Sequence, residues 1–209
     1  MSNEVKTKEK VDMDPKYIAK LAVTLFVTCV IVAGLLGFVN KLTLPNITAA
    51  NEKKTAEAIQ KVMPEMDGSP AAMELTEEMT AAASGAGATV TEAYEAQAGG
   101  STIGYALKVV ASGSQGNIEM MVGVDTEGVV TGVSIVKNSE TSGIGSKVMS
   151  NEPLSSGVGV LDQFQGKSAA ADGTLTVGKN VDAISGATVS SKGVTAGVNA
   201  ALAVAGAIG

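Results

Sequence analysis

Residues 118–136 read IEMMVGVDTEGVVTGVSIV, which is two β-rich apolar runs joined by the turn sequence Asp-Thr-Glu-Gly. Gly128 ends that turn, where the positive φ of a tight hairpin favours glycine. A third run, GYALKVVAS, precedes them at residues 104–112. The three runs predict an antiparallel sheet.

Helices are expected beside this sheet. Small and apolar residues recur at helical spacing over residues 190–205, which predicts a closing helix that packs tightly. A helix is also expected over residues 146–165, although Pro153 and the Ser/Gly cluster at 155–159 interrupt it. Residues 81–89 (AAASGAGAT) are low in complexity and predict a flexible loop. Together these elements indicate an α+β fold.

Residues 21–39 (LAVTLFVTCVIVAGLLGFV) form an uncharged apolar run. As a helix, the run would extend about 28 Å, which is close to the hydrocarbon thickness of a bilayer. No small-residue cleavage motif follows it, so we expect a retained membrane anchor rather than a cleaved signal peptide. The run contains no charge and therefore offers no ion path of its own.

The lysines around this run predict its orientation. Five precede it (Lys6, Lys8, Lys10, Lys16, Lys20) and three follow it (Lys41, Lys53, Lys54). The positive-inside rule then places the N-terminus in the cytoplasm. We expect a single-pass protein of the inner or plasma membrane, with an extracytoplasmic domain whose antiparallel sheet is flanked by helices.

The expected organisation has four parts, and the third is a membrane-proximal helix. Asn46 and Thr48 supply a capping-type start for that helix, and Pro64 would stop it. The parts are a cytoplasmic leader (1–20), a transmembrane helix (21–39), the membrane-proximal helix (40–66) and a folded domain (67–209).

The composition excludes several kinds of chemistry. The chain has no His, no Arg, no Trp and a single Cys, Cys29. Nucleophile systems that use imidazole cannot be built, and neither can zinc, haem or iron–sulfur sites. We therefore expect no catalytic residue and no metal site. The net charge of −6 argues against nucleic acid as a partner.

Two nucleotide-binding patterns are nearly present. Residues 166–168 (GKS) resemble the end of a P-loop, but Leu161 stands where that loop needs glycine. Residues 143–145 and 157–159 each read G-x-G without the third glycine of a dinucleotide-binding fold. We expect no ATP or NAD site.

Residues 181–194 (VDAISGATVSSKGV) combine a turn of small residues with a helix start. The free N–H groups at the start of a helix can bind an anion, so a phosphate could lie there with the Thr188 hydroxyl at its mouth. The other interpretation is an ordinary strand–turn–helix junction with Ser190 or Ser191 as N-cap. The spacing of these residues alone does not decide between the two interpretations.

This stretch also carries a resemblance. Residues 182–190 (DAISGATVS) match the signature D-x-x-[ST]-G-A-[ST]-x-[ST] of domains to which a flavin transferase attaches FMN. With the anchor, the GYA sequence at 104–106, ETSGIG at 140–145 and FQGK at 164–167, the chain resembles the G subunit of Rnf-type ferredoxin:NAD oxidoreductases. It is also similar to the C subunit of the sodium-pumping NADH:quinone reductase.

The resemblance implies a site and its cofactor. Thr188 would carry one FMN per chain through a phosphoester, and Asp182 and Ser190 would serve recognition or hydrogen bonding. The remaining implied contacts are Ser185, Gly186, Ala187, Glu140, Thr141, Gly143 and Ile144. Members of this family usually read E-T-P-G-L-G, whereas this chain has Ser142 for Pro and Ile144 for Leu, which affects the rigidity of that loop.

The resemblance also implies a function and partners. The chain would relay electrons within a membrane complex that drives ion translocation, with the other membrane subunits as partners and the flavin transferase acting during maturation. The alternatives are a C-type subunit of the sodium-pumping reductase, a free-standing FMN electron carrier, and a non-enzymatic anchored interaction protein.

Overall fold

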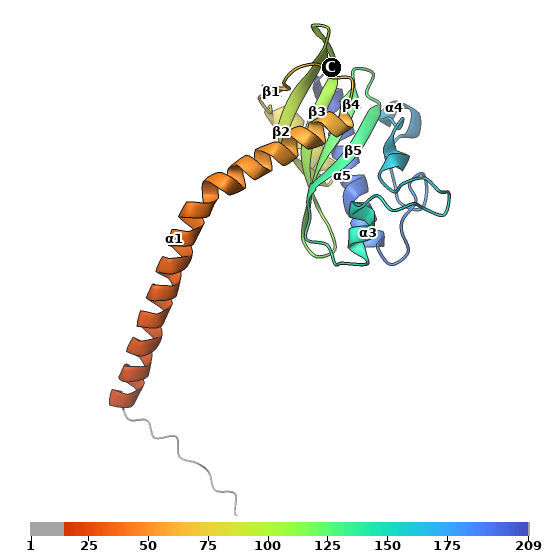
Figure 1. The fold of residues 1–209 in the computed structure, drawn as a ribbon. Helices are drawn as coiled ribbons and strands as arrows, with labels where there is room; N and C mark the ends of the chain where they lie inside the picture. The colour runs from red at the N-terminus through yellow and green to blue at the C-terminus, as the bar shows by residue number, and fades with distance from the viewer. Residues whose placement is uncertain (1–14, 209) are drawn as a thin grey trace, which may run out of the picture. The chain divides into compact units, whose positions relative to one another are not determined.

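The structure, a computed structural model, describes residues 15–208. The chain divides into two compact units, Met1–Asn51 and Glu52–Gly209, which are described separately. Helix α1 (Pro15–Val62) runs through the boundary between them (Figure 1).

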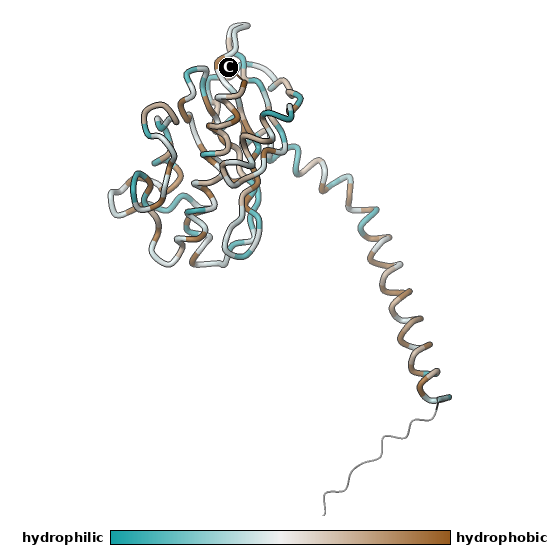
Figure 2. The backbone as a smooth tube through the Cα atoms, turned by 180° about the vertical axis from the view of Figure 1, so that it is seen from behind, coloured by the Kyte–Doolittle hydropathy of each residue, from teal (hydrophilic) through white to brown (hydrophobic). Residues whose placement is uncertain are grey.

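The part of α1 in the first unit is apolar and exposed along its length (Figure 2). Its most apolar 18-residue window contains no buried residue. Thr24 and Thr28 donate their hydroxyls at 2.8 Å to the Lys20 and Leu25 carbonyls of the same helix. Their polar groups are thereby satisfied within the helix, as a bilayer requires.

The expected helix start at Asn46 is wrong, because α1 continues through Pro45 and the residues after it. Continuing an existing helix avoids the free-energy cost of nucleating a new one. Pro45 removes one backbone hydrogen-bond donor and strains the preceding turn, but it does not end the helix. The helix ends at Val62, just before Pro64, as expected.

The second unit contains a five-stranded antiparallel sheet in which the strands lie in chain order. This confirms the α+β fold. The strands are β1 (Ala71–Met73), β2 (Ala88–Ala98), β3 (Ser101–Ser112), β4 (Asn117–Asp125) and β5 (Val130–Lys137). The last three match the predicted runs, whereas β1 and β2 were not predicted.

The flexible loop expected at residues 81–89 is wrong. Helix α2 (Glu77–Gly85) occupies its first half and β2 begins at Ala88. Thr76 caps α2 by accepting a hydrogen bond from the Met79 N–H at 3.2 Å. Alanine favours helices, so a capped, alanine-rich segment forms one here.

Helices α2 and α5 (Thr188–Ile208) cover one face of the sheet (Figure 1). Their apolar residues share a core with alternate residues of β2, β3 and β4, including Leu107, Met120 and Val122. Helix α5 is apolar enough to cross a membrane, but 61% of its window is buried in this core. It is therefore the core helix of the second unit.

The last turns of α1 pack on the opposite face of the sheet, where Ile59, Val62 and Met63 are buried. Glycines make room for them. A Cβ at Gly123 would overlap the Val62 carbonyl, and Gly132, its cross-strand partner, lies under the same turn. Thr131 donates its hydroxyl to the Val62 carbonyl at 2.6 Å and so satisfies the end of the helix.

The segment between β5 and α5 is mostly irregular. The helix expected over 146–165 is wrong: only α3 (Gly145–Met149) and the 3₁₀ helix η1 (Asp162–Phe164) form, followed by α4 (Ala169–Asp172). Pro153 and the adjacent Ser/Gly residues prevent a continuous helix. The closing helix was correctly predicted, but it begins at Thr188, two residues before the expected start.

Candidate functional site

Residues 182–187, here called the acceptor turn, lead directly into helix α5. The Ala187 N–H donates to the Ile184 carbonyl at 2.9 Å, and Gly186 adopts a φ of +81°. A residue with a side chain rarely adopts that conformation, which accounts for glycine at this position. Thr188 is the first residue of α5 and is exposed.

A pocket of about 140 Å³ lies beside Thr188. It is formed by the β3–β4 turn, the segment after β5 and the start of α5. The lining residues are Ser114, Glu140, Thr141, Ile144, Gly145, Gly186, Ala187, Thr188, Val189 and Ser190.

The Glu140 carboxylate joins these three segments. Its Oε1 accepts hydrogen bonds from the backbone N–H groups of Ser114 at 2.7 Å and Gln115 at 3.2 Å. Its Oε2 accepts a 2.6 Å hydrogen bond from the hydroxyl of Ser190, in the first turn of α5. Glu140 therefore fixes one wall of the pocket relative to Thr188.

Two glycines enclose this carboxylate. A Cβ at Gly113 would overlap Oε1 of Glu140, and a Cβ at Gly145 would overlap Oε2 and lie 2.9 Å from the Ser190 hydroxyl. The short distances from Glu140 to its donors depend on both glycines.

Exposed apolar side chains flank the pocket. Ile144 is 51% exposed and Val189 is 56% exposed. Gly143, with φ +79°, precedes Ile144, and its N–H donates to the Ser146 hydroxyl at 2.8 Å. The loop that carries Ile144 is therefore held by a local turn.

The pocket has room for a group of phosphate size but not for a tricyclic ring. Pockets that enclose a drug-sized ligand usually measure about 300–1,000 Å³, so a ring of that size would lie outside this one. Among the lining residues, Glu140 alone is charged. A phosphate monoester in the pocket would lie near the Glu140 carboxylate with no cation among the lining residues. A phosphodiester carries one negative charge fewer, so the carboxylate would repel it less.

The structure brings together most of the predicted site residues. Glu140, Thr141, Ile144 and Ser190 line the pocket with Gly186, Ala187 and Thr188. Three others do not line it: Gly143 supports the loop, while Ser185 and Asp182 lie outside the pocket in the acceptor turn. The side chains of Ser185 and Asp182 form no hydrogen bond within residues 15–208. Contact of any of these residues with a cofactor stays a prediction.

Sequence reasoning missed three lining residues: Ser114, Gly145 and Val189. Ser114 belongs to the turn between β3 and β4, and nothing in the sequence connects that turn with the acceptor turn. Gly145 and Val189 are next to predicted residues, but only the folded geometry shows that they line the same pocket.

A family profile described as FMN-binding domain matches residues 113–203. The match begins at Gly113 beside Glu140 and includes the whole pocket and most of α5. The matched part of the chain contains the pocket, and the profile supports FMN as the cofactor of this domain.

The chain is similar to G subunits of membrane oxidoreductase complexes. It is 35% identical to the G subunit of the Na⁺-translocating ferredoxin:NAD⁺ oxidoreductase complex of Acetobacterium woodii, over 96% of this chain and 97% of the relative. It is 29% identical to the G subunit of the ion-translocating oxidoreductase complex of Methanosarcina acetivorans, over 90% of this chain and 95% of the relative.

A solved structure was also found. It is the crystal structure of the C subunit of the Na⁺-translocating NADH-quinone reductase from Parabacteroides distasonis, with 18% identity and a TM-score of 0.48, covering 78% of this chain and 93% of that chain.

Proposed function

This chain belongs to the family of G subunits of Rnf-type ion-translocating oxidoreductase complexes, and we propose that it carries FMN covalently on Thr188 and relays electrons within such a complex. As a member of this family, the chain is an FMN-binding electron-transfer subunit of a membrane-associated complex. Our proposal adds that the bond to FMN is covalent, that it is formed by Thr188, and that the chain crosses the membrane once.

One observation carries the covalent assignment. Thr188 is an exposed threonine at the first position of a helix, and the residues that line the pocket beside it include a carboxylate but no cation. Non-covalent binding of phosphate at a helix start contributes only about 0.3–2 kcal/mol. A covalent bond would retain the cofactor where such binding would not.

The attachment chemistry would come from a flavin transferase and its metal ion. The Thr188 oxygen would attack the phosphorus of the FMN half of FAD, and the bond to AMP would break. AMP would leave, and the threonine proton would pass to a base of the transferase. The described residues place no such base against the Thr188 hydroxyl, so this chain would be the substrate in that step.

The chain's own residues would then hold and shield the cofactor. Glu140 and Ser190 fix the pocket wall, Thr141 offers a hydroxyl at its rim, and Ile144 and Val189 offer an apolar surface for the ring. FMN, when bound, supplies redox chemistry that no side chain provides.

The proposed topology is a single-pass protein with a cytoplasmic N-terminus and an extracytoplasmic second unit. The apolar part of α1, residues 21–39, is uncharged. It therefore carries no group that could move an ion across a membrane. Ion translocation would lie in the partner subunits, with this chain supplying electron transfer.

The intact mass of the denatured full chain tests the assignment. The chain and a Thr188→Ala variant would each be co-produced with a flavin transferase, with Thr126→Ala as control because Thr126 is exposed in a turn outside the pocket. We expect the parent and the control to gain the mass of FMN less one water, and Thr188→Ala to gain nothing. A parent without added mass would favour the anchored interaction protein instead.

A further inference from the structure

The acceptor turn packs on the core through Ala187 and Ile184, but few hydrogen bonds join it to the rest of the fold. Within it, the Ala187 N–H bonds the Ile184 carbonyl. In the described part of the chain, the hydrogen bonds that reach residues 182–186 from outside the turn come from one side chain, Gln163.

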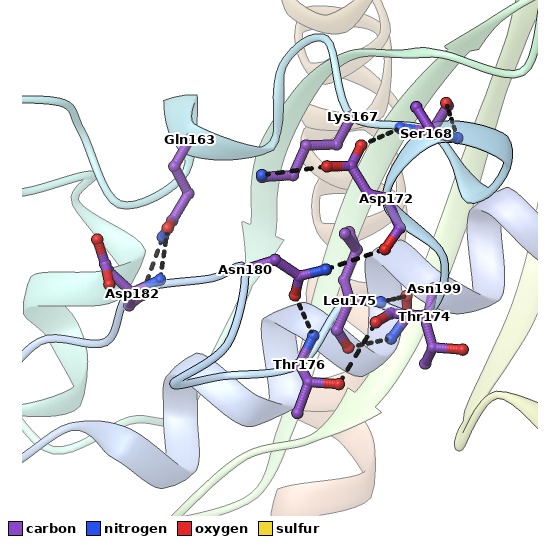
Figure 3. Close-up of polar contacts among 11 residues, drawn as sticks. Gln163, Lys167, Ser168, Asp172, Thr174, Leu175, Thr176, Asn180, Asp182 and Asn199 are labelled. Carbon is purple, nitrogen blue, oxygen red and sulfur yellow. Dashed lines mark hydrogen bonds and ion pairs between the residues drawn. The ribbon is translucent and has the colours of Figure 1, made fainter.

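Gln163 pairs with both backbone groups of Asp182. Its Oε1 accepts from the Asp182 N–H at 2.8 Å, and its Nε2 donates to the Asp182 carbonyl at 3.0 Å (Figure 3). The same Nε2 also donates to the Val160 carbonyl at 2.8 Å, which fixes the amide plane. The Gln163 side chain thus replaces a neighbouring strand for the first residue of the acceptor turn.

Gln163 is itself firmly positioned. It lies in η1 between two residues of the core, Leu161 and Phe164. Just after η1, the Gly166 N–H donates to the Val130 carbonyl and the Val130 N–H donates to the Lys167 carbonyl, both at 2.9 Å. A chain of contacts therefore runs from β5 through η1 and Gln163 to Asp182.

The segment before Asp182 is held by a similar contact. Asn199 of α5 donates to the Leu175 carbonyl and accepts from the Leu175 N–H, each at 2.9 Å (Figure 3). Asn180 accepts from the Thr176 N–H at 2.7 Å. The Asn199 contact holds Leu175, which lies about seven residues before the acceptor turn. Gln163, in contrast, holds Asp182, the first residue of the turn.

We infer that Gln163 is a positioning residue for flavin attachment, which presents the acceptor turn and the Asp182 carboxylate to the flavin transferase. This inference rests on the proposed function. Without Gln163, the Asp182 backbone would lose both partners and the turn would sample other conformations. Fewer molecules would then have the acceptor turn in the conformation that the transferase recognises. The apparent affinity of the transferase for the chain would fall in proportion.

The test uses the full-length apo chain, produced without a transferase and purified in detergent. A purified transferase and FAD then modify it over a range of chain concentrations, and mass spectrometry follows the product. Gln163→Ala should raise the KM for the chain about fivefold to tenfold with kcat retained. Gln163→Glu keeps the side-chain length and the acceptor for the Asp182 N–H but loses the hydrogen bonds donated to the Val160 and Asp182 carbonyls, so it should also raise KM, by a smaller factor.

Two controls separate positioning from folding. Gln165→Ala removes an exposed glutamine whose side chain has no hydrogen bond among the described residues, and it should match the parent. Asn199→Ala removes the similar contact at Leu175 and should lower the melting temperature without raising KM. Amide exchange in the apo chain should accelerate at residues 182–187 only in the Gln163 variants.

The outcomes are distinct. A modified parent with an unchanged KM in both Gln163 variants would overturn this inference alone. A rise in KM of equal size in Asn199→Ala would overturn it too, because general loosening would then explain the effect. An unmodified parent would overturn the proposed function, and this inference with it.

Discussion

The hydroxyl of Ser190 donates a 2.6 Å hydrogen bond to the carboxylate of Glu140, 50 residues earlier in the chain. Ser190 is 1% exposed, so water cannot readily replace its carboxylate partner. This contact joins the start of α5 to the segment after β5 and sets the width of the pocket between them.

Ser190→Ala should lower the free energy of unfolding by about 1.5–3 kcal/mol, because it removes a hydrogen bond to a charged group and leaves Glu140 with backbone donors alone. Ser191→Ala is the matched control. Ser191 is 2% exposed, but its hydroxyl donates to the neutral Ala187 carbonyl of the same helix, so its loss should cost less. Urea unfolding of the apo chain measures both, and an equal cost would contradict a special role for the Glu140 contact.

Gly145→Ala should destabilise the second unit by about 1–3 kcal/mol, the usual cost of overpacking a filled site. The added methyl would overlap the Glu140 carboxylate and displace it from Ser190. Gly206→Ala, where a Cβ meets nothing within 4 Å, should be neutral or stabilising because alanine favours helices. Thermal unfolding compares them, and similar melting temperatures would show that the carboxylate can shift freely.

Ile144→Thr should change the free energy of unfolding of the apo chain by less than about 0.5 kcal/mol, because the side chain is mostly exposed. In the flavin-loaded chain it should increase quenching of flavin fluorescence by iodide, since an apolar cover over the ring is lost. Val158→Thr is the control, because Val158 is 45% exposed and does not line the pocket. Equal quenching in the two variants would place the ring elsewhere.

The stability of the chain should depend on pH through Tyr94. Burial, together with a 2.6 Å hydrogen bond to the Glu92 carboxylate, raises the pKa of Tyr94 from its usual 10.0 to about 12. A raised pKa means that the folded state holds this proton more tightly than the unfolded chain. The contribution is therefore complete below pH 10.0 and is lost as the pH rises through about 12.

Tyr94→Phe removes this contribution, so the difference in stability between parent and variant should shrink between pH 10.0 and about 12. Urea unfolding across that range measures it. Tyr105→Phe is the control, because the Tyr105 hydroxyl makes no hydrogen bond among residues 15–208. A difference between parent and Tyr94→Phe that does not change with pH would mean that the hydroxyl contributes only through packing.

The sequence predicted the elements in which local pattern and tertiary context agree. Strands β3 to β5 are rich in apolar and β-branched residues around a recognisable turn, and α5 repeats small and apolar residues at helical spacing. Strand β2 (ATVTEAYEAQA) was missed because alanine and glutamate disfavour strands. Its pairing with β3 along most of its length overrides that preference.

The candidate site was only partly predictable, because some of its contacts depend on tertiary structure rather than on local sequence. The acceptor turn is contiguous in sequence, so its motif identified Thr188 as the candidate acceptor. The contacts that hold it join distant segments: Glu140 with Ser190, and Gln163 with Asp182. A serine in an α-helix and a glutamine in a short 3₁₀ helix have many possible partners, and only the fold selects among them.

The strand order has a consequence for the sequence of events during maturation. Each strand of the sheet pairs with its neighbour in the chain, and such local contacts cost less loop-closure entropy than distant ones. The Glu140–Ser190 contact requires α5 to return across 50 residues. A transferase that recognises the start of α5 in its folded position would therefore modify only chains in which this distant contact has formed, and an attached flavin would report that α5 had docked.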